Sequence, residues 1–506
     1  MVISLDVFDT ALLRNVYAPQ DMFTLIEQDV CRDFARKRKD AENKAREKNF
    51  YYNIYDIYEF LPEFDVNVEI QAELENCKAN IDVLKMYMKN PDNYVFISDM
   101  YLPSKVICSM LERIGYKHPR VFVSCEMKAL KWDGALFSKV QKVIGEKISK
   151  HYGDNYVADI EGAQKAGIYD VQFKPALHNI KVNLPAVRDV RLKKYLAEVL
   201  VSKRTAEDKI ALLMAPIILS FTKWVLKQRK EGQKIFFLSR DMITAYRIAT
   251  EILGEKDVYY LHASRRSLGA ASLKSGNKGL IDKMWLILNS QEMKEFENRD
   301  VNETLKYLNR YDIKDNDIIV DIGYSGTIQA SIDSILGIKT QGLYMQIFPE
   351  TLFDVDAKEY FRRRVVHYCL MIEVPLGSDE DCVEDYKDGE VIFKPEHEER
   401  KELARRMTAI IMEGARKLVK EKQIISTLDA EQILVHMQFY PSKEMIEVFN
   451  KPIFSNRDIG ESVINFNKER ILKGGLRAMC QRSYAYKLFK QLLEEDPELS
   501  HLSSLI

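Results

Sequence analysis

Four separated segments of the chain carry side chains suited to a single phosphate chemistry. Three of the segments follow apolar runs that predict β-strands: Val2 to Leu5, Tyr94 to Ile97 and the stretch before Gly153. Because the carboxyl ends of parallel strands meet at one edge of a sheet, we expect the side chains after these runs to lie together. The side chains that this pattern would bring together are Asp6, Ser98, Lys131, Asp154 and Asp159.

Each of these side chains has a role in one reaction. Asp6, Asp154 and Asp159 supply the hard oxygen ligands that Mg²⁺ prefers, and Mg²⁺ accepts a substrate phosphate in its coordination shell. Asp6 could then attack the phosphorus as a carboxylate nucleophile and form an aspartyl-phosphate. Ser98 and Lys131 would hold the phosphoryl oxygens, where charge grows in the transition state. Taken singly, these residues also have structural interpretations: Asp6 and Asp9 could cap a helix that starts at Thr10, Ser98 could cap the next helix, and Lys131 could be a solvated surface charge.

In the order and context of these segments, the chain resembles the haloacid dehalogenase (HAD) superfamily. The matching segments are, in chain order, LDVFDT, YVFISDM, LKWDGALF and HYGDNYVADIEG. The family's motifs are a strand ending in Asp, a strand ending in Ser or Thr, a Lys, and a Gly-Asp-x-x-x-x-Asp loop. The resemblance covers residues 1–178 and implies a Mg²⁺-dependent phosphatase on an HAD-like Rossmannoid α/β domain.

One position departs from the pattern of the family's phosphatases. They usually carry a second Asp two residues after the nucleophile, which serves as general acid and base, but Phe8 stands there in this chain. Asp9, one residue further on, could protonate the leaving oxygen or activate water, although a shift of one residue turns a strand-end side chain toward a different face. Two other interpretations stay open: a dehalogenase-like member, and a domain that keeps the fold without catalysis.

Residues 15–90, between the first two motifs, have the pattern of an inserted helical cap. They are rich in Glu, Lys, Tyr and Leu, and the clearest predicted helices are Pro19 to Lys39 and Val68 to Lys89. A cap of this kind excludes water from the reaction and selects substrates by size. The plainer interpretation is that these amphipathic helices only pack against the domain.

Length, composition and cysteine usage limit the number of domains, the class of partner and the cellular compartment that we expect. A chain of 506 residues is too long for one core and predicts at least two domains. Its 46% hydrophobic and 30% charged residues are typical of a soluble globular protein, and the net charge of −1 does not favour nucleic acid as a partner. The seven scattered cysteines indicate reduced thiols in the cytoplasm. We expect no signal peptide, because the N-terminus leads directly into a predicted strand with a functional motif. We also expect no transmembrane segment, because the apolar stretch Ile210 to Leu226 contains Pro216 and Lys223 and is better explained as a buried helix.

The second half of the chain predicts another α/β domain. A helical linker is expected over residues 179–209, then a domain over 210–506 with an α/β core at about 230–370 and a helical part at 371–506, in which Glu398 to Lys422 and Ser483 to Glu495 are the clearest helices. Apolar runs that alternate with helical segments favour a mostly parallel, covered sheet. These runs are Ile235 to Leu238, Val258 to Leu261, Ile318 to Val320, Gly342 to Phe348 and Val365 to Leu370.

Three of these runs end in polar clusters, where open α/β sheets bind ligands. The first cluster contains Arg240 and Asp241, and the second contains Arg265 and Arg266. The third, DIGYSGT, starts at Asp321 and continues into a predicted helix, so that its backbone N–H groups and hydroxyls can face a phosphate. Arginine adds fork-shaped cations that match phosphate oxygens. The clusters together predict a pocket for a multiply phosphorylated small molecule, although a tight turn and structural arginines would explain the same residues.

IIVDIGYSGT is similar, in shortened form, to the loop with which phosphoribosyltransferases hold phosphoribosyl pyrophosphate (PRPP). Fused to an HAD half, the segments FLSRD, ASRRS and DIGYSGT resemble the dual-domain ribofuranosyltransferases of bacterial surface-polysaccharide assembly, over nearly the whole chain. In that family the C-terminal part moves ribose 5-phosphate from PRPP to a glycan hydroxyl, and the HAD part removes the 5-phosphate. The resemblance implies a PRPP donor, a lipid-linked glycan acceptor and Mg²⁺.

The resemblance also implies roles for the residues of the second half. The three arginines, Arg240, Arg265 and Arg266, would bind the leaving pyrophosphate. Asp241 could orient or deprotonate the acceptor hydroxyl, and Asp321 would contact a ribose hydroxyl or Mg²⁺. The residues that would surround a phosphate are Ser325, Gly326 and Thr327.

Three hypotheses about function remain on the sequence alone. The first is a two-step ribofuranosyltransferase that combines phosphoribosyl transfer with phosphatase activity. The second is an HAD-family sugar-phosphate phosphatase with an accessory binding domain, and the third is a noncatalytic assembly protein. A cytoplasmic location is expected, peripheral association with the inner face of the membrane is compatible with a lipid-linked acceptor, and the oligomeric state stays open.

Overall fold

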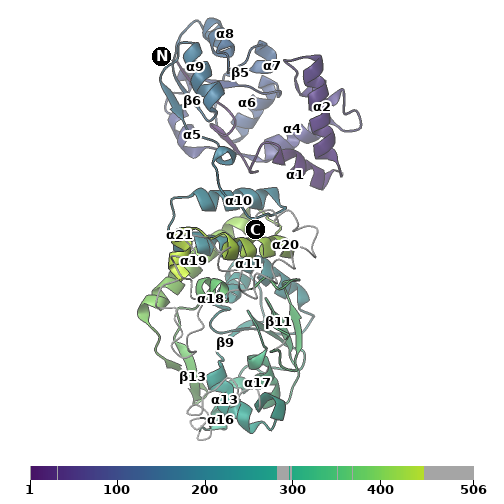
Figure 1. The fold of residues 1–506 in the computed structure, drawn as a ribbon, viewed down its shortest axis with the longest axis vertical. Helices are drawn as coiled ribbons and strands as arrows, with labels where there is room; N and C mark the ends of the chain where they lie inside the picture. Colours follow the sequence, from purple (N-terminus) through teal and green to yellow (C-terminus); the bar gives the residue numbers. More distant parts are fainter. Residues whose placement is uncertain are drawn as a thin grey trace. The chain divides into compact units, whose positions relative to one another are not determined.

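The computed structural model describes residues 2–30, 32–281, 296, 299–349, 351–366 and 369–449. The chain divides into two compact units, Met1–Leu184 with Arg188–Ser202, and Pro185–Val187 with Lys203–Ile506. Each unit contains one five-stranded parallel sheet with helices around it (Figure 1). The protein is therefore a two-unit α/β protein with a helical C-terminal region, as the sequence predicts.

The sheet of the first unit has the strand order β5-β4-β1-β6-β7. Leu5 of the central strand pairs in register with Phe96 on one side and Tyr152 on the other, so the three strands predicted from the sequence end at the same edge. All three predictions are confirmed. The bounds of the strands are β1 (Val2–Leu5), β4 (Tyr94–Ser98), β5 (Val121–Val123), β6 (Ile148–Gly153) and β7 (Val171–Phe173).

Helices cover both faces of this sheet because β4 is apolar on both sides. Val95 and Ile97 pack into the same buried cluster as Leu136, Phe137 and Val140 of α8 (Ala135–Ile144). Phe96 points to the opposite face and belongs to the cluster of α6 (Ser104–Arg113). The shorter helices of this core are α7 (Ser124–Met127), the π-helix η2 (Tyr156–Glu161) and α9 (Gly162–Lys165).

The inserted segment between β1 and β4 is largely helical, with two differences from the prediction. The helix expected at Pro19 to Lys39 is two helices, because Asp33 adopts a left-handed conformation (φ 69°) between them. The helix expected at Val68 to Lys89 is interrupted where β3 pairs with β2. The elements are β2 (Leu12–Arg14), α1 (Asp21–Asp29), α2 (Phe34–Lys48), α3 (Ile54–Tyr58), α4 (Val66–Glu75), β3 (Cys77–Ala79) and α5 (Ile81–Tyr87).

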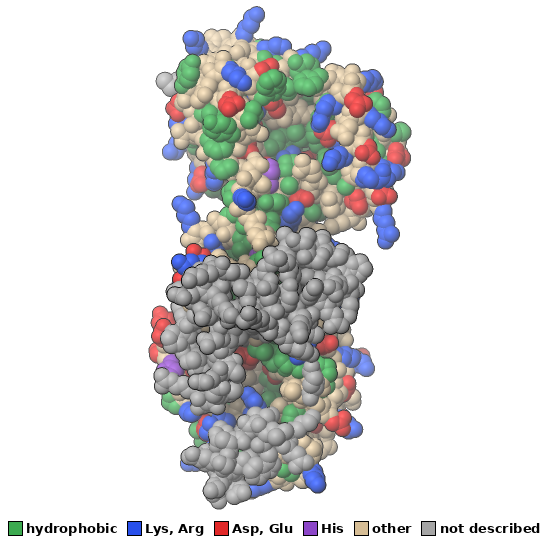
Figure 2. Space-filling model, in the orientation of Figure 1, with side chains coloured by type: hydrophobic (Ala, Val, Ile, Leu, Met, Phe, Trp, Pro, Cys, Tyr) green, Lys and Arg blue, Asp and Glu red, His purple; other side chains and the backbone are tan. Residues whose placement is uncertain are grey.

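Two buried ion pairs join elements of the inserted segment: Arg14 of β2 pairs with α4, and Arg38 of α2 pairs with the same helix. Arg14 Nε donates to Glu73 Oε2 at 3.0 Å, and Arg38 Nη2 donates to Glu69 Oε1 at 2.9 Å. Helix α10 (Val190–Val201) also belongs to the first unit, in which it contacts α1, although the sequence analysis assigned it to a linker. On the face of this unit seen in Figure 2, basic and acidic side chains are interspersed.

The sheet of the second unit has the order β12-β11-β10-β8-β9. The strand predicted at Val365 to Leu370 is wrong: Val365 and Val366 lie outside any strand, and a helix begins at Leu370. The fifth strand is instead Asp356–Glu359, a mostly exposed edge strand whose polar sequence carries no apolar signal. The other strands are β8 (Ile235–Leu238), β9 (Val258–Leu261), β10 (Ile318–Asp321) and β11 (Gln341–Tyr344), and β12 is the edge strand.

Helix α11 (Ala206–Gln228) is the one described helix long and apolar enough to cross a bilayer, but most of it is buried against α19 and α20. It therefore has the environment of a core helix, as expected for Ile210 to Leu226. Helices around the second sheet are α12 (Ile243–Arg247), the π-helix η4 (Ile248–Ile252), α13 (Arg265–Lys274), α16 (Val301–Asn309) and α17 (Thr327–Leu336).

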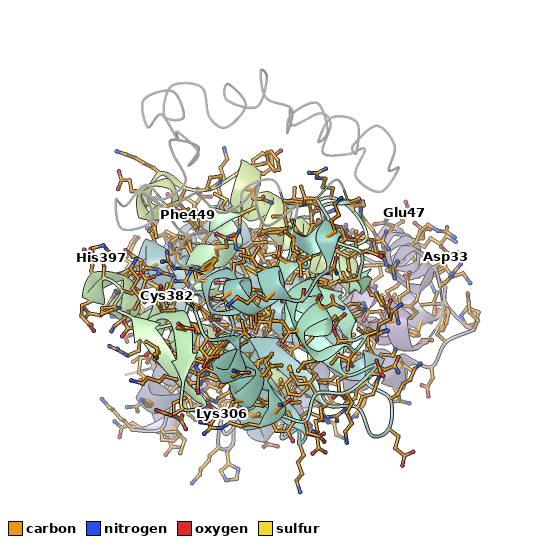
Figure 3. The ribbon with its side chains drawn as sticks, turned by 90° about the horizontal axis from the view of Figure 1, so that it is seen from below. Asp33, Glu47, Lys306, Cys382, His397 and Phe449 are labelled. Atoms are coloured by element: carbon orange, nitrogen blue, oxygen red, sulfur yellow. The ribbon has the colours of Figure 1, made fainter. Side chains whose placement is uncertain are left out.

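Between residues 370 and 449, the described part of the C-terminal region, the chain is largely helical but contains one β-hairpin that was not predicted from the sequence. The hairpin consists of β13 (Cys382–Lys387) and β14 (Glu390–Lys394), and Figure 3 labels Cys382 at its start and His397 just before the next helix. The predicted helix at Glu398 is confirmed as α19, whereas Ser483 to Glu495 lies outside the described residues. The helices are α18 (Leu370–Leu376), α19 (Glu398–Lys420), α20 (Thr427–Phe439) and α21 (Lys443–Phe449).

Candidate active sites

Asp6 and Lys131 meet at the carboxyl edge of the first sheet. Asp6 directly follows β1, and its backbone N–H donates to the carbonyl of Tyr152 on β6 at 2.8 Å. Its carboxylate accepts a hydrogen bond from Lys131 Nζ, which also donates to Asp159 Oδ1 at 2.6 Å. Asp6 and Lys131 are 5% and 3% exposed, so this pairing is largely shielded from solvent. One ammonium group therefore donates hydrogen bonds to two carboxylates that were predicted from the sequence to lie together.

Asp159 is held by donors on every side. Its Oδ2 accepts from the backbone N–H groups of Asp154 at 3.1 Å and Asn155 at 2.9 Å, and its Oδ1 lies 3.0 Å from His151 Nε2. The other ring nitrogen of His151 lies 2.8 Å from Ser4 Oγ, which fixes the ring. Burial acts to raise the pKa of Asp159, but Lys131 and His151 lower it below its ordinary value.

His151 was not predicted from the sequence to be a site residue. The available signal was a histidine inside a predicted buried strand, where a polar side chain needs a partner. The structure supplies that partner as Asp159, and the side chain of His151 is fully buried.

Two glycines are required by close approach in this site. A Cβ atom on Gly153 would lie 2.3 Å from Asp159 Cγ, and a Cβ atom on Gly162 would lie 1.9 Å from the carbonyl oxygen of Lys131. Neither distance is compatible with a side chain. The glycines therefore allow the acidic loop and the lysine segment to pack against each other.

The carboxylates of Asp6, Asp154 and Asp159 fit a divalent cation. Each offers one oxygen, and these oxygens lie within 4.8 Å of one another. Burial raises the pKa of Asp6 well above its ordinary value, and burial together with the charge of Asp159 raises the pKa of Asp154 to about 7. Carboxylates that oppose one another's ionisation in this way are stabilised by a bound cation, and an all-oxygen donor set suits Mg²⁺.

Ser98 and Asp99 complete the edge next to Asp6. Ser98 is the last residue of β4, is 2% exposed and lies on the strand adjacent to β1. Both carboxylate oxygens of Asp99 accept from the backbone N–H of Lys131 at 3.0 Å. Asp99, which the sequence analysis did not single out as a site residue, thus positions the lysine segment.

Phe8 and Asp9 follow β1 in a turn. The guanidinium carbon of Arg14 lies 4.0 Å from the centroid of the Phe8 ring, so Phe8 packs against the inserted segment. Asp9 has a left-handed backbone conformation (φ 57°), and its negative charge contributes to the raised pKa of Asp154. The structure therefore brings the carboxylate of Asp9 close to the acidic cluster despite its shift by one residue.

In the second unit, three partly buried carboxyl groups interact at the carboxyl edge of the sheet. Asp241 follows β8, and Asp321 ends the neighbouring strand β10. Burial is the largest cause that raises the pKa of Asp321 well above its ordinary value, and the negative charge of Asp241 is the second. The same two causes raise the pKa of Glu373 to about 7. Arg265 opposes both shifts, so its charge belongs to the same cluster. Glu373 on α18 was missed, although a single acid in the apolar segment LMIEVPL was a signal.

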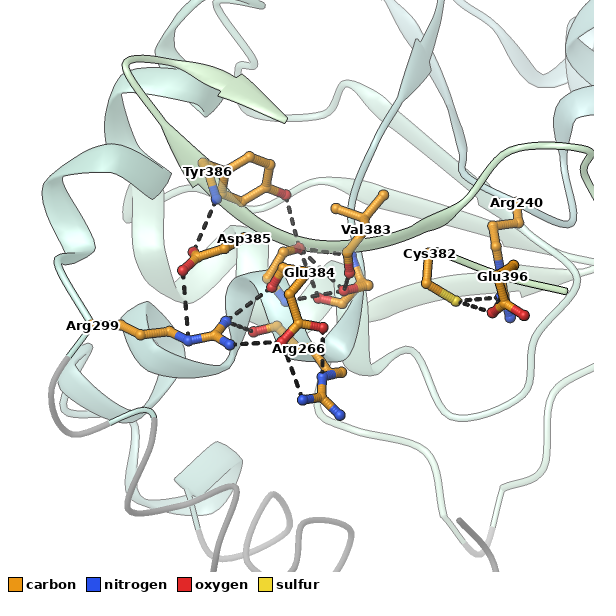
Figure 4. Close-up of polar contacts among 11 residues, drawn as sticks. Arg240, Arg266, Arg299, Cys382, Val383, Glu384, Asp385, Tyr386 and Glu396 are labelled. Atoms are coloured by element: carbon orange, nitrogen blue, oxygen red, sulfur yellow. Dashed lines mark hydrogen bonds and ion pairs between the residues drawn. The ribbon is translucent and has the colours of Figure 1, made fainter. Parts of the chain in front are cut away.

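Arg240 and Arg266 are engaged by carboxylates at the hairpin (Figure 4). Arg240 Nη1 donates to Glu396 Oε1 at 2.9 Å and lies 2.6 Å from the sulfur of Cys382. Arg266 Nη2 donates to Glu384 Oε1 at 3.1 Å, and Arg299 donates to the same oxygen at 2.9 Å. Of the three arginines predicted to bind one pyrophosphate, only Arg265 lacks a described carboxylate hydrogen bond.

The DIGYSGT loop leads into a helix as predicted. A Cβ atom on Gly323 would lie 2.3 Å from the carbonyl oxygen of Gln346, and Gly326 has φ 72° immediately before α17 begins at Thr327. Ser325 Oγ lies 2.8 Å from Thr351 Oγ1. The loop therefore leads from Asp321 at the end of β10 to the start of α17, while the hydroxyl of Ser325 bonds to another loop.

No protein-family model matches the chain, and no curated protein matches it.

Proposed function

We propose that the protein adds ribofuranose to a bacterial surface polysaccharide in two steps. The second unit transfers ribose 5-phosphate from PRPP to a glycan hydroxyl, and the first unit removes the 5-phosphate in a Mg²⁺-dependent reaction. The observation that carries the proposal is the pair of hydrogen bonds from Lys131 to Asp6 and Asp159. A carboxylate oxygen of Asp154 lies within 4.8 Å of an oxygen of each of these two acids. This arrangement supports phosphoryl transfer to Asp6.

In the phosphatase step, Asp6 attacks the phosphorus and the bond to the ribose O5 breaks, which leaves an aspartyl-phosphate. Asp9 gives a proton to the leaving oxygen and then takes one from the water that attacks phosphorus, so that the bond between phosphorus and the Asp6 oxygen breaks, inorganic phosphate is released and Asp6 is regenerated. Lys131 and Ser98 hold the phosphoryl oxygens. Mg²⁺, held by Asp6, Asp154 and Asp159, would supply charge neutralisation between the nucleophile and the incoming phosphate.

In the transfer step, the bond between ribose C1 and pyrophosphate breaks, and the acceptor oxygen bonds to C1. Asp241 is the candidate to take the acceptor's proton, because burial raises its pKa and so makes it a stronger base than an ordinary aspartate. Arg265 would stabilise the leaving pyrophosphate, and Arg240 would join it after release from Glu396. Asp321 would contact a ribose hydroxyl or Mg²⁺, and the DIGYSGT loop would face a phosphate.

A specific observation favours the second candidate function, a sugar-phosphate phosphatase with an accessory binding domain. Both Arg240 and Arg266 bond to carboxylates, so the second unit does not present three unpaired cations to an anion. In either case the proposed setting is the cytoplasm, and a lipid-linked acceptor would draw the enzyme to the inner face of the membrane.

The experiment compares wild-type protein with Asp6→Asn and Asp241→Asn. Each is incubated with Mg²⁺, PRPP and a panel of lipid-linked or synthetic glycans, and the acceptor mass and released pyrophosphate are followed. The proposal expects a pentose added by wild type, a pentose phosphate retained by Asp6→Asn, and no addition by Asp241→Asn. Asp82→Asn, at an exposed position on α5, is the matched control and should behave as wild type. Hydrolysis of ribose 5-phosphate without any acceptor gain would favour the accessory-domain function.

A further inference from the structure

His178 lies beside Asp9 and has an unused ring nitrogen. It sits in the short helical turn Leu177–Asn179, and its Nδ1 is 3.9 Å from Asp9 Oδ2. This nitrogen is buried and has no hydrogen-bond partner among the described residues. The two side chains as a whole are 23% and 21% exposed, so the pair can still be reached from solvent. A buried polar atom without a partner, at the edge of a catalytic cluster, needs an explanation.

The turn around Asp9 has an unusual backbone conformation and a second buried polar group without a partner among the described residues. Asp9 has φ 57°, which is uncommon for a residue other than glycine and is often found at functional sites. The hydroxyl of its neighbour Thr10 is likewise buried without a hydrogen-bond partner among the described residues. The strained turn thus directs Asp9 toward the acidic cluster and leaves hydrogen-bonding capacity unused on both sides of it.

We propose that His178 is the positioning residue for Asp9, and that this pair replaces the acid and base that Phe8 has removed from its usual place. Nδ1–H of His178 donates to the Asp9 carboxyl group and holds it toward the leaving oxygen. A separation of 3.9 Å is too long for a hydrogen bond in the free enzyme, but such contacts shorten when substrate binds.

The proton balance leaves His178 unchanged through the cycle. Asp9 loses its proton to the ribose O5 in the first step and regains one from water in the second. His178 keeps its Nδ1 proton and stabilises Asp9 while it is a carboxylate. The inference rests on the proposed phosphatase activity of the first unit.

The test uses full-length protein, with ribose 5-phosphate and p-nitrophenyl phosphate as probes. His178→Ala removes the donor. His178→Asn restores one, because the Asn amide nitrogen is separated from Cα by the same number of bonds as Nδ1, whereas His178→Gln places its amide one bond further out. His118→Asn, at an exposed loop position, is the control. Asp6→Asn, Asp9→Asn and the double variant Asp9→Asn with His178→Ala complete the set.

The expected result is a fall in kcat of about tenfold to a hundredfold for His178→Ala on ribose 5-phosphate, with KM unchanged, as is usual when a supporting hydrogen bond to a catalytic group is lost. His178→Asn should recover most of the loss, and the double variant should be no slower than Asp9→Asn. With p-nitrophenyl phosphate, whose leaving group needs no proton, His178→Ala should keep the initial burst of nitrophenolate.

Full kcat in His178→Ala, or an additive loss in the double variant, would overturn the inference. If thermal unfolding shows that His178→Ala is not folded, the activities of His178→Asn and His178→Gln are compared instead. Equal activities in these two variants would contradict a donor at Nδ1. Failure of the proposed function is distinguishable: it appears as wild-type hydrolysis that is absent or that survives Asp6→Asn. Hydrolysis that requires Asp6 but ignores every change at His178 refutes only the inference.

Discussion

Lys131 Nζ lies 2.6 Å from Asp159 Oδ1 and donates at the same time to the carboxylate of Asp6. A single cation therefore holds the proposed nucleophile and a proposed metal ligand in one geometry. Because the lysine is 3% exposed, its removal would leave buried acids without their nearest positive charge.

Replacement of Lys131 by Met should abolish most phosphate release. The expected loss in kcat is about a hundredfold to a thousandfold, since the ammonium would otherwise stabilise charge on the phosphoryl oxygens in the transition state. Release of inorganic phosphate from ribose 5-phosphate is the measurement. Lys147→Met, at an exposed position in the same unit, should keep wild-type activity. A Lys131→Met enzyme within threefold of wild type would contradict the assignment.

Gly153→Ala should disrupt the acidic loop. The added Cβ would lie 2.3 Å from Asp159 Cγ, so the loop must move. We expect the free energy of unfolding to fall by about 1–3 kcal/mol, as in other overpacked sites, and hydrolysis to be lost with it. Gly279→Ala is the matched comparison: Gly279, like Gly153, has no positive φ, but the nearest atom to its added Cβ, Asn277 Oδ1, lies at an ordinary contact distance of 3.7 Å. Thermal unfolding and phosphate release are measured on both, and equal activity in the two variants would refute the close-approach argument.

Glu373 should make the stability of the second unit depend on pH near neutrality. Burial, followed by the charge of Asp241, raises its pKa from 4.5 to about 7. The folded state therefore favours the protonated form, and the resulting stabilisation is fully present below pH 4.5 and is lost as pH rises through about 7. At pH 8 the wild type has lost this stabilisation, whereas Gln at position 373 does not ionise. The stability of Glu373→Gln relative to wild type should therefore be higher at pH 8 than at pH 5. The thermal unfolding midpoint is measured at both values.

Glu402→Gln is the control for this comparison, because Glu402 is exposed on α19. Its midpoint should follow that of wild type at both pH values. Parallel pH dependence in Glu373→Gln and wild type would show that Glu373 does not titrate in this range.

Glu396→Gln should strengthen binding of pyrophosphate to the second unit. Glu396 Oε1 accepts from Arg240 at 2.9 Å and so competes with a phosphate for that guanidinium. Because Arg240 is partly exposed, the pair contributes modestly, and we expect the dissociation constant to fall about threefold to tenfold, which corresponds to about 1 kcal/mol.

Calorimetric titration of pyrophosphate with and without Mg²⁺ measures this change. Glu398→Gln, two residues further along and paired with Lys401, is the control and should leave the affinity unchanged. Weaker binding in Glu396→Gln would mean that Glu396 orients Arg240 for the ligand.

Much of the first unit could be predicted from sequence because its strands are short, apolar and buried. Val2 to Leu5 and Tyr94 to Ile97 are strands, and Asp6 and Ser98 follow or end them, since a buried parallel strand needs apolar side chains on both faces. The same signal found β8, β9 and β10. It failed at Asp356–Glu359, because an exposed edge strand needs no apolar side chains.

The sequence by itself determined which residue types end the strands and, through Gly153 and Gly162, that two segments could approach closely. Only the tertiary structure decided which charges pair. Hydrogen bonds between side chains depend on positions set by distant elements: His151 reaches Asp159 across a loop, and Arg240 reaches Glu396 beyond a hairpin that local sequence did not indicate. Ion pairs between distant segments, unlike the (i, i+4) pairs within helices, follow no periodicity along the chain, so they are established only when folding brings the partners within a few ångströms.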